Sequence, residues 1–196
     1  MTQYFTNNES LKSEYRNIIY KYNDCSFNFT SDLGVFSKDR VDFASKLLVE
    51  TYFELGKKNK NVLDVGCGYG FIGIVLSKIM GAKVDMIDVN KRAVHLSNIN
   101  IKNIGVNANA FVSNIYENID KKYDVIITNP PIRAGKVVYM NIIENAVNYL
   151  TDDGELWFVM NKDHGAKSTI EKIKNVYNVN VLKKEKGFFV ILCKKR

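Results

Sequence analysis

From Asn61 onward the sequence alternates between short apolar runs and longer amphipathic segments, with glycine or polar turns between them. Short runs rich in β-branched residues are typical of buried strands, and the amphipathic segments have the length of helices. We expect strands at 61–65, 83–88, 109–112, 123–128 and 155–160, and helices at 71–80, 91–103, 136–150 and 166–176. This alternation restricts the chain to an α/β fold with a mainly parallel, doubly wound sheet and right-handed crossovers.

Two antiparallel hairpins are expected outside this alternation, formed by residues 15–22 with 26–30 and by residues 179–184 with 187–193. Both show the alternating pattern of strands on either side of turn residues. The second hairpin turns at Glu185-Lys186 and adds an antiparallel partner at or near one edge of the sheet.

The segment after the first hairpin predicts a further helix. Either Ser37 or Asp39 is suited to cap it, because their side chains accept hydrogen bonds from the first free N–H groups of a helix. Its apolar face would contain Val41, Phe43, Leu47, Leu48 and Phe53. A turn is also expected at 152–154, ahead of the strand at 155–160.

The composition is that of an ordinary globular domain, with 196 residues of which 46% are hydrophobic and 25% charged. No apolar run approaches the length of a membrane span, and the first residues lack the features of a signal peptide. Cys25, Cys67 and Cys193 are far apart and form no CxxC pair, so neither a disulfide framework nor a cysteine-rich zinc site is expected. We therefore expect a cytoplasmic protein with no metal and no membrane partner.

The net charge of +7 favours a polyanionic partner. Lysine, asparagine and isoleucine are all abundant, as an A/T-rich coding sequence would also produce, so the total alone is weak support. The position of the charges is more informative, because Arg133 and Lys136 follow directly after the only two prolines. Basic groups beside a candidate active site favour RNA as the partner.

A glycine-rich turn joins the first strand of the alternating region to the following helix, with the sequence Asp64-Val65-Gly66-Cys67-Gly68-Tyr69-Gly70. Alternate glycines allow a tight turn and let a ligand lie against the main chain. About twenty residues later Asp88 ends the second strand, where a carboxylate can accept hydrogen bonds from both hydroxyls of a ribose. The pair of features predicts a cofactor that contains a nucleoside.

Two cofactors fit this turn. Residues 68–73 match the GxGxxG fingerprint of dinucleotide-binding proteins, which favours NAD. However, Asp64 stands two residues before the first glycine, where an acid would repel a pyrophosphate but could receive the ammonium group of S-adenosylmethionine, directly or through water. We therefore favour S-adenosylmethionine as the cofactor.

The two prolines stand together after a strand, in the sequence Thr128-Asn129-Pro130-Pro131. In an open α/β sheet, ligands bind at this carboxyl edge. Proline fixes φ and has no N–H, so we expect the carbonyls here to project from stiff backbone with few local donors nearby. The Asn129 carboxamide oxygen and the Pro130 carbonyl would then suit a substrate that donates two hydrogen bonds from one nitrogen.

Together these motifs resemble those of class I S-adenosylmethionine-dependent methyltransferases that act on planar amino or amide nitrogens. The strings at 30–37 and 129–136 further resemble the small-subunit rRNA guanine-N2 methyltransferases, in particular single-domain relatives of their catalytic half. The similarity extends from about residue 27 to residue 195. It implies a Rossmann-like, seven-stranded sheet whose last strand is antiparallel, preceded by a small hairpin and helix.

The resemblance also implies roles for individual residues. Gly66, Gly68 and Gly70 would line the methionine part of the cofactor, and Asp88 would hold the ribose. Ser113 and Asn114 match the position that meets the adenine amino group, where many relatives have Asp and an Asn oxygen can accept the same bond. Asn129 and Pro130 would be catalytic, and the substrate would contact Phe36, Pro131, Ile132, Arg133 and Lys136.

One residue departs from the pattern of related base and glutamine methyltransferases, which commonly have an aromatic residue after the second proline. Here that residue is Ile132, so the aromatic stacking of about 1–3 kcal/mol per base is lost there. We expect either another aromatic, such as Phe36, to supply the stacking, or substrate binding to depend more on charge.

The resemblance divides the chain into an N-terminal extension at 1–38, which packs on the core and covers the cofactor, and a catalytic domain at 39–196. Guanine N2 of small-subunit rRNA is the expected target. Methylation of protein glutamine at N5 is an alternative, because a glutamine amide offers the same two N–H groups, and an RNA-binding module without activity is another. The sequence leaves open whether the protein is a monomer or a homodimer.

Overall fold

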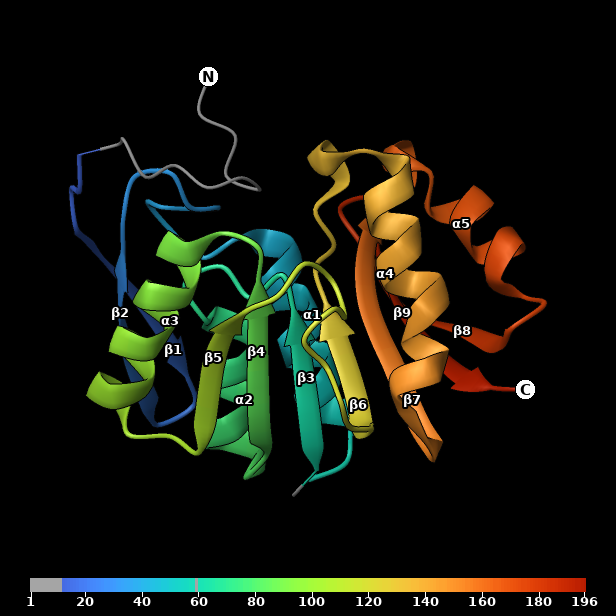
Figure 1. The fold of residues 1–196 in the computed structure, drawn as a ribbon, viewed down its shortest axis with the longest axis horizontal. Helices are drawn as coiled ribbons and strands as arrows, with labels where there is room; N and C mark the ends of the chain where they lie inside the picture. The colour runs from blue at the N-terminus through green and yellow to red at the C-terminus, as the bar shows by residue number, and fades with distance from the viewer. Residues whose placement is uncertain (1–11, 59) are drawn as a thin grey trace.

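The computed structural model describes residues 12–58 and 60–196. Its centre is a seven-stranded sheet in the order β5-β4-β3-β6-β7-β9-β8 (Figure 1). These strands are β3 (Asn61–Val65), β4 (Lys83–Asp88), β5 (Ala108–Val112), β6 (Tyr123–Thr128), β7 (Leu150–Asn161), β8 (Tyr177–Glu185) and β9 (Phe188–Lys195). All run parallel except β9, which is antiparallel to both neighbours. The expected sheet and its antiparallel last strand are confirmed, with β9 inserted between β7 and β8.

Helices cover both faces of the sheet, and Figure 1 shows α4 in front of it and α1 and α2 behind. They are α1 (Phe43–Leu55), α2 (Phe71–Met80), α3 (Lys91–Ile104), α4 (Lys136–Tyr149) and α5 (Ala166–Ile173). Successive residues of a strand point to opposite faces, so Val62 packs in a core with α1, α2 and α3, while Leu63 packs in a core with α4 and α5. Two buried faces explain why the strands are apolar throughout.

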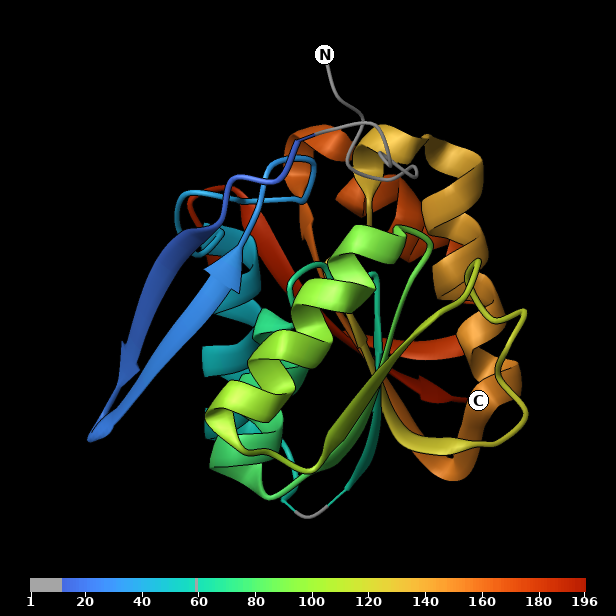
Figure 2. The same ribbon diagram turned by 60° about the vertical axis from the view of Figure 1, so that its left-hand side comes forward.

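An N-terminal hairpin of β1 (Arg16–Tyr22) and β2 (Cys25–Ser31) pairs only with itself and projects beside the helices (Figure 2). Its inner aromatic side chains pack on α2, and the Tyr20 and Phe71 rings meet edge to face at 5.0 Å. Asn100 of α3 fixes the end of β2, accepting from the Thr30 N–H at 2.7 Å and donating to the Thr30 carbonyl at 2.9 Å. Residues 1–11 of the expected extension lie outside the described residues.

The capping expectation for the first helix is wrong. Asp42 is the N-cap of α1, and Val41 lies outside the helix. Ser37 instead has a φ of 55° and donates its hydroxyl hydrogen to the Arg40 carbonyl, while Asp39 forms an ion pair with Arg16. Both candidate caps are therefore engaged in the loop that precedes the helix.

Two other boundaries differ from expectation. The turn at 152–154 lies within β7, which pairs with β6 at Leu150, bulges outward and resumes pairing at Glu155. The last helix ends at Ile173, three residues earlier than expected. No helix in the described part of the chain is long and apolar enough to cross a membrane.

Candidate functional site

A cavity of about 260 Å³ opens at the carboxyl ends of β3, β4 and β6. The residues expected at the site that line it are Phe36, Gly66, Gly68, Asp88, Ser113, Asn114, Asn129, Pro130 and Pro131. They come from five separate loops, which the parallel strands bring to one edge of the sheet. Of the expected site residues, Asp64, Gly70, Ile132, Arg133 and Lys136 do not line the cavity.

The floor of the cavity is the glycine turn between β3 and α2. The N–H groups of Gly66 and Cys67 both donate to the Ile87 carbonyl, at 2.8 and 3.0 Å, which fixes the turn to the end of β4. Gly66 and Gly68 have φ values of 76° and 58°, and no atom lies within 4 Å of where their Cβ atoms would be. The positive φ values therefore require glycine, and the open space beside the backbone is available to a ligand.

Gly70 has a different task. It is the N-cap of α2, with a φ of 93°, and a Cβ there would lie 2.9 Å from Ile74 Cδ1 and 3.0 Å from Ser97 Oγ. Close packing of α2 against α3, together with the positive φ, explains this glycine. It does not face the cavity.

Asp88 lies at the cavity wall and holds the two loops around it. Its Oδ2 accepts from the Gly68 N–H at 3.0 Å, and its Oδ1 accepts from the Asn90 N–H at 2.9 Å. Burial raises the pKa of this carboxyl, and the backbone hydrogen bonds partly offset that effect. Each carboxylate oxygen retains acceptor capacity toward the cavity.

Asp64 is fully buried beneath the glycine turn and does not line the cavity. Its Oδ2 accepts from the Gly73 N–H at 2.9 Å, so it ties β3 to the first turn of α2. Its Oδ1 has no hydrogen-bond partner among the described residues. Burial raises the pKa of Asp64 to about 7, with the charge on Asp88 adding to the shift and the Gly73 hydrogen bond opposing it.

Ser113 and Asn114 follow β5 on the far side of Asp88. The buried Ser113 donates its hydroxyl hydrogen to the Ile115 carbonyl at 2.9 Å. Asn114 donates from Nδ2 to Glu117 Oε1 at 2.7 Å, so its amide oxygen is the end left to accept a hydrogen bond.

Asn129 reaches the cavity between two residues of α1. Its Nδ2 donates to Asp42 Oδ2 at 3.0 Å and to Ser45 Oγ at 2.9 Å. Asp42 and Ser45 both line the cavity as well. The sequence analysis did not assign either residue to the site.

The Pro130 carbonyl is less open than expected. It accepts from the Ile132 N–H at 2.8 Å, across a Pro131 with φ of −75° and ψ of 79°, which is the geometry of an inverse γ-turn. The expectation of few local donors is therefore wrong for this carbonyl, because the residue after the prolines folds back onto it. One lone pair of the oxygen remains.

The expected substrate residues separate into two groups. Phe36 is 38% exposed and lines the cavity. Ile132 is half-buried and packs against the core beneath α4 and α5, in a short 3-10 turn (Ile132–Ala134). Arg133 and Lys136 are exposed on that same turn and at the start of α4, outside the cavity. No group of three or more potential metal ligands is found in residues 12–58 and 60–196.

Comparison with known proteins agrees with this site. The family model described as the methyltransferase small domain matches residues 26–192. The chain is 43% identical over 197 residues to the uncharacterized protein YbxB of Bacillus subtilis, with 98% of each chain covered.

Longer relatives carry a printed activity. The ribosomal RNA small subunit methyltransferase C of Psychromonas ingrahamii is 29% identical over 194 residues, which cover 96% of this chain and 53% of the relative. A solved structure of the T. thermophilus 16S rRNA N2 G1207 methyltransferase (RsmC), in complex with AdoMet and guanosine, superposes with a TM-score of 0.84 at 27% identity. It is matched over 95% of this chain and 52% of its own, so the chain spans about half the length of these relatives.

Proposed function

Because the chain belongs to the methyltransferase small domain family, we propose that it is an S-adenosylmethionine-dependent N-methyltransferase whose target is guanine N2 in small-subunit rRNA. The observation that carries the proposal is the placement of Asn129. Its carboxamide lies in the same cavity as Asp88 and the glycine turn, with its nitrogen engaged by α1 and its oxygen free to accept. The related RsmC that binds AdoMet and guanosine supports the cofactor and the base.

The cavity residues fit the parts of this cofactor. Gly66 and Gly68 leave open space beside the backbone, Asp88 offers acceptors for the ribose hydroxyls, and Asn114 offers an amide oxygen for the adenine amino group. When bound, S-adenosylmethionine supplies a methyl group on a positively charged sulfur, which is a strong electrophile. Asp64 lies beneath the turn, so we propose that it acts on the ammonium group through water or through its charge.

The role of the chain is to orient a poor nucleophile. The lone pair of an exocyclic amino group is delocalised into the base, and hydrogen bonds from its two N–H groups to Asn129 Oδ1 and the Pro130 carbonyl draw the nitrogen toward tetrahedral geometry. These oxygens also stabilise the positive charge that develops on nitrogen during transfer. The proton becomes far more acidic after methylation, so no side chain has to act as a strong base beforehand.

The rim of the cavity suits an RNA substrate. Phe36 stands at the mouth, where it can stack on a base, while Ile132 is turned toward the core. Arg133 and Lys136 lie beside the catalytic loop and are placed to contact phosphates. These positions support RNA over a glutamine-containing protein, although either substrate offers the two N–H groups that Asn129 and Pro130 accept.

The test is nucleoside mass spectrometry of rRNA from cells with and without the gene. We expect N2-methylguanosine to be missing at one position of the small-subunit rRNA in the deletion strain and to return with the wild-type gene. Unchanged rRNA with a loss of N5-methylglutamine would instead identify a protein substrate. No change in either would leave an RNA-binding module without activity.

Complementation with Asn129→Ala links the result to the site. Loss of one charge-stabilising group typically lowers turnover by about a hundredfold to a thousandfold, so this variant should not restore the methylated nucleoside. Calorimetry should show S-adenosylmethionine affinity within about threefold of wild type, because one hydrogen bond to the substrate is removed and the cofactor turn is untouched. Wild-type turnover by Asn129→Ala would refute the proposed chemistry.

A further inference from the structure

We propose that Asp42 and Ser45, at the start of α1, are positioning residues that fix which end of the Asn129 amide faces the substrate. The proposal rests on the proposed function, because it concerns how the proposed acceptor oxygen is aimed. It adds two residues that lie 87 and 84 positions before Asn129 in the chain.

The chemistry of the two contacts defines the orientation of the amide. A carboxylate accepts hydrogen bonds and cannot donate them, so the group facing Asp42 Oδ2 at 3.0 Å must be the NH₂ end of Asn129. The second N–H points to Ser45 Oγ at 2.9 Å. Both hydrogens of the amide are thereby used, and Oδ1 is the end left to accept from a substrate.

Ser45 is held in the accepting state by the same carboxylate. Its hydroxyl donates to Asp42 Oδ2 at 3.2 Å, so its oxygen lone pairs are left for Asn129. Asp42 Oδ2 also accepts from the Ser45 N–H at 2.9 Å, the hydrogen bond that caps α1. The three side chains form a closed triangle in which every donor has an assigned acceptor.

The triangle is anchored to a rigid element. Ser45 is 7% exposed, and Leu48 and Val49, one turn further along α1, are fully buried in the core. The amide is therefore aimed by a packed helix on one face of the sheet. Without these contacts, rotation of the amide by a half-turn would place its NH₂ group opposite the N–H groups of the substrate, where no hydrogen bond can form.

Two substitutions of Asp42 separate aiming from helix capping. Serine is a good N-cap but is too short to reach Asn129, so Asp42→Ser retains the capping role and loses the contact. Asparagine is an equally good N-cap and keeps an oxygen in place, so Asp42→Asn retains both. Melting temperatures of the two variants show that any difference between them does not come from the fold.

The first measurement needs no substrate. In ¹H–¹⁵N NMR spectra, the Asn129 side-chain amide signals are identified by their absence in Asn129→Ala. We expect Asp42→Ser to move both signals to the positions of a free amide and to speed their exchange with solvent, and Asp42→Asn to leave them near the wild-type positions. Unchanged signals in Asp42→Ser would overturn the inference whether or not the protein methylates RNA.

The second measurement is the single-turnover rate on small-subunit rRNA isolated from the deletion strain. Misaimed groups reduce rates by about tenfold to a hundredfold, and we expect that loss for Asp42→Ser, a smaller loss for Asp42→Asn and unchanged S-adenosylmethionine affinity in both. Equal rates for wild type and Asp42→Ser would show that aiming does not matter. If wild type itself transfers no methyl group to this RNA, the proposed function fails while the NMR result still decides the orientation.

Discussion

Asp64 combines full burial, one backbone hydrogen bond and an oxygen with no partner among the described residues. Burial raises its pKa in the folded protein to about 7, whereas an unfolded chain has an Asp pKa near 4. Between these values the unfolded state releases the proton and the folded state keeps it. The contribution of Asp64 to the free energy of unfolding therefore falls as pH rises from about 4 to about 7.

We predict that Asp64→Asn removes this dependence. Each unit of pKa difference corresponds to about 1.4 kcal/mol, so wild type should lose a few kcal/mol relative to the variant across that pH range. Urea unfolding of both proteins at pH 4.5, 6 and 8 measures the difference. Parallel stability curves would show that the pKa of Asp64 is not raised.

The same carboxyl reports on cofactor binding. If Asp64 senses the ammonium group, a ¹³C NMR titration should give a midpoint near pH 7 for the free protein and a lower one with S-adenosylmethionine, since a nearby positive charge favours the ionised form. An unchanged midpoint would remove Asp64 from the cofactor site and leave it the role of tying β3 to α2.

At the scale of elements, α2 packs closely against β4 through Gly73. A Cβ at this position would collide with Met86 and would lie 3.1 Å from Val84 Cγ1. We predict that Gly73→Ala lowers the free energy of unfolding by about 1–3 kcal/mol, the usual effect of overpacking. Chemical denaturation measures it, with the exposed Lys78→Ala of the same helix as the control that should change stability by less than about 0.5 kcal/mol.

Sequence predicted the elements well where a local signal defines both ends. The helix at 71–80 and the strand at 123–128 have the expected bounds, because glycine precedes and follows the first, and Asn-Pro-Pro ends the second. The cap of α1 was wrong because Ser37, Asp39 and Asp42 are all good caps, and only the tertiary contacts of Arg16 and Arg40 show that the first two are otherwise engaged.

The candidate site divides in the same way. The glycine turn, Asp88 and Asn129 were predictable, since each follows directly from a strand end. Asp42 and Ser45 were not, because nothing local to α1 indicates which loop its first turn will face. The hydrogen bond between Ile132 and Pro130 was also missed, since it depends on the ψ angle of Pro131, which proline leaves free.

At the scale of the whole molecule, the net charge of +7 attracts RNA from any direction, so position must decide which charges bind it. We predict that Arg133→Gln with Lys136→Gln weakens RNA binding and flattens its salt dependence by roughly 0.7 to 0.9 per lost phosphate contact. Fluorescence anisotropy with the rRNA target between 50 and 300 mM salt, concentrations that span about a threefold change in screening length, measures the slope.

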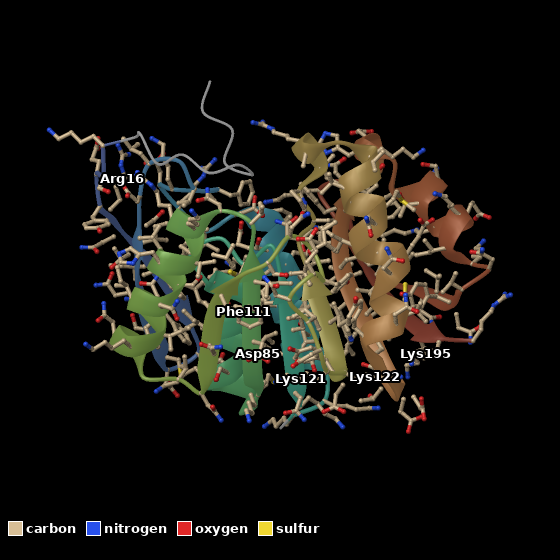
Figure 3. The ribbon with its side chains drawn as sticks, viewed as in Figure 1. Arg16, Asp85, Phe111, Lys121, Lys122 and Lys195 are labelled. Carbon is tan, nitrogen blue, oxygen red and sulfur yellow. The ribbon has the colours of Figure 1, made fainter. Side chains whose placement is uncertain are left out.

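A matched pair of substitutions controls for the loss of charge. Lys83 begins β4 and Lys122 precedes β6, both at the amino edge of the sheet, where Figure 3 shows Lys122 far from the cavity mouth. Lys83→Gln with Lys122→Gln removes the same two charges and should leave most of the slope intact. Equal effects from the two pairs would mean that RNA is attracted by net charge alone.

The insertion of β9 between β7 and β8 has a consequence for the order of folding during synthesis. β7 pairs with β6 on one side and with β9 on the other, and β8 pairs only with β9. While the ribosome is still making residues 188–195, the outer edge of β7 has no strand partner, and β8 has none at all. An unpaired apolar edge is a template for association between nascent chains, so the last strand synthesised is the one that closes this protein to its neighbours.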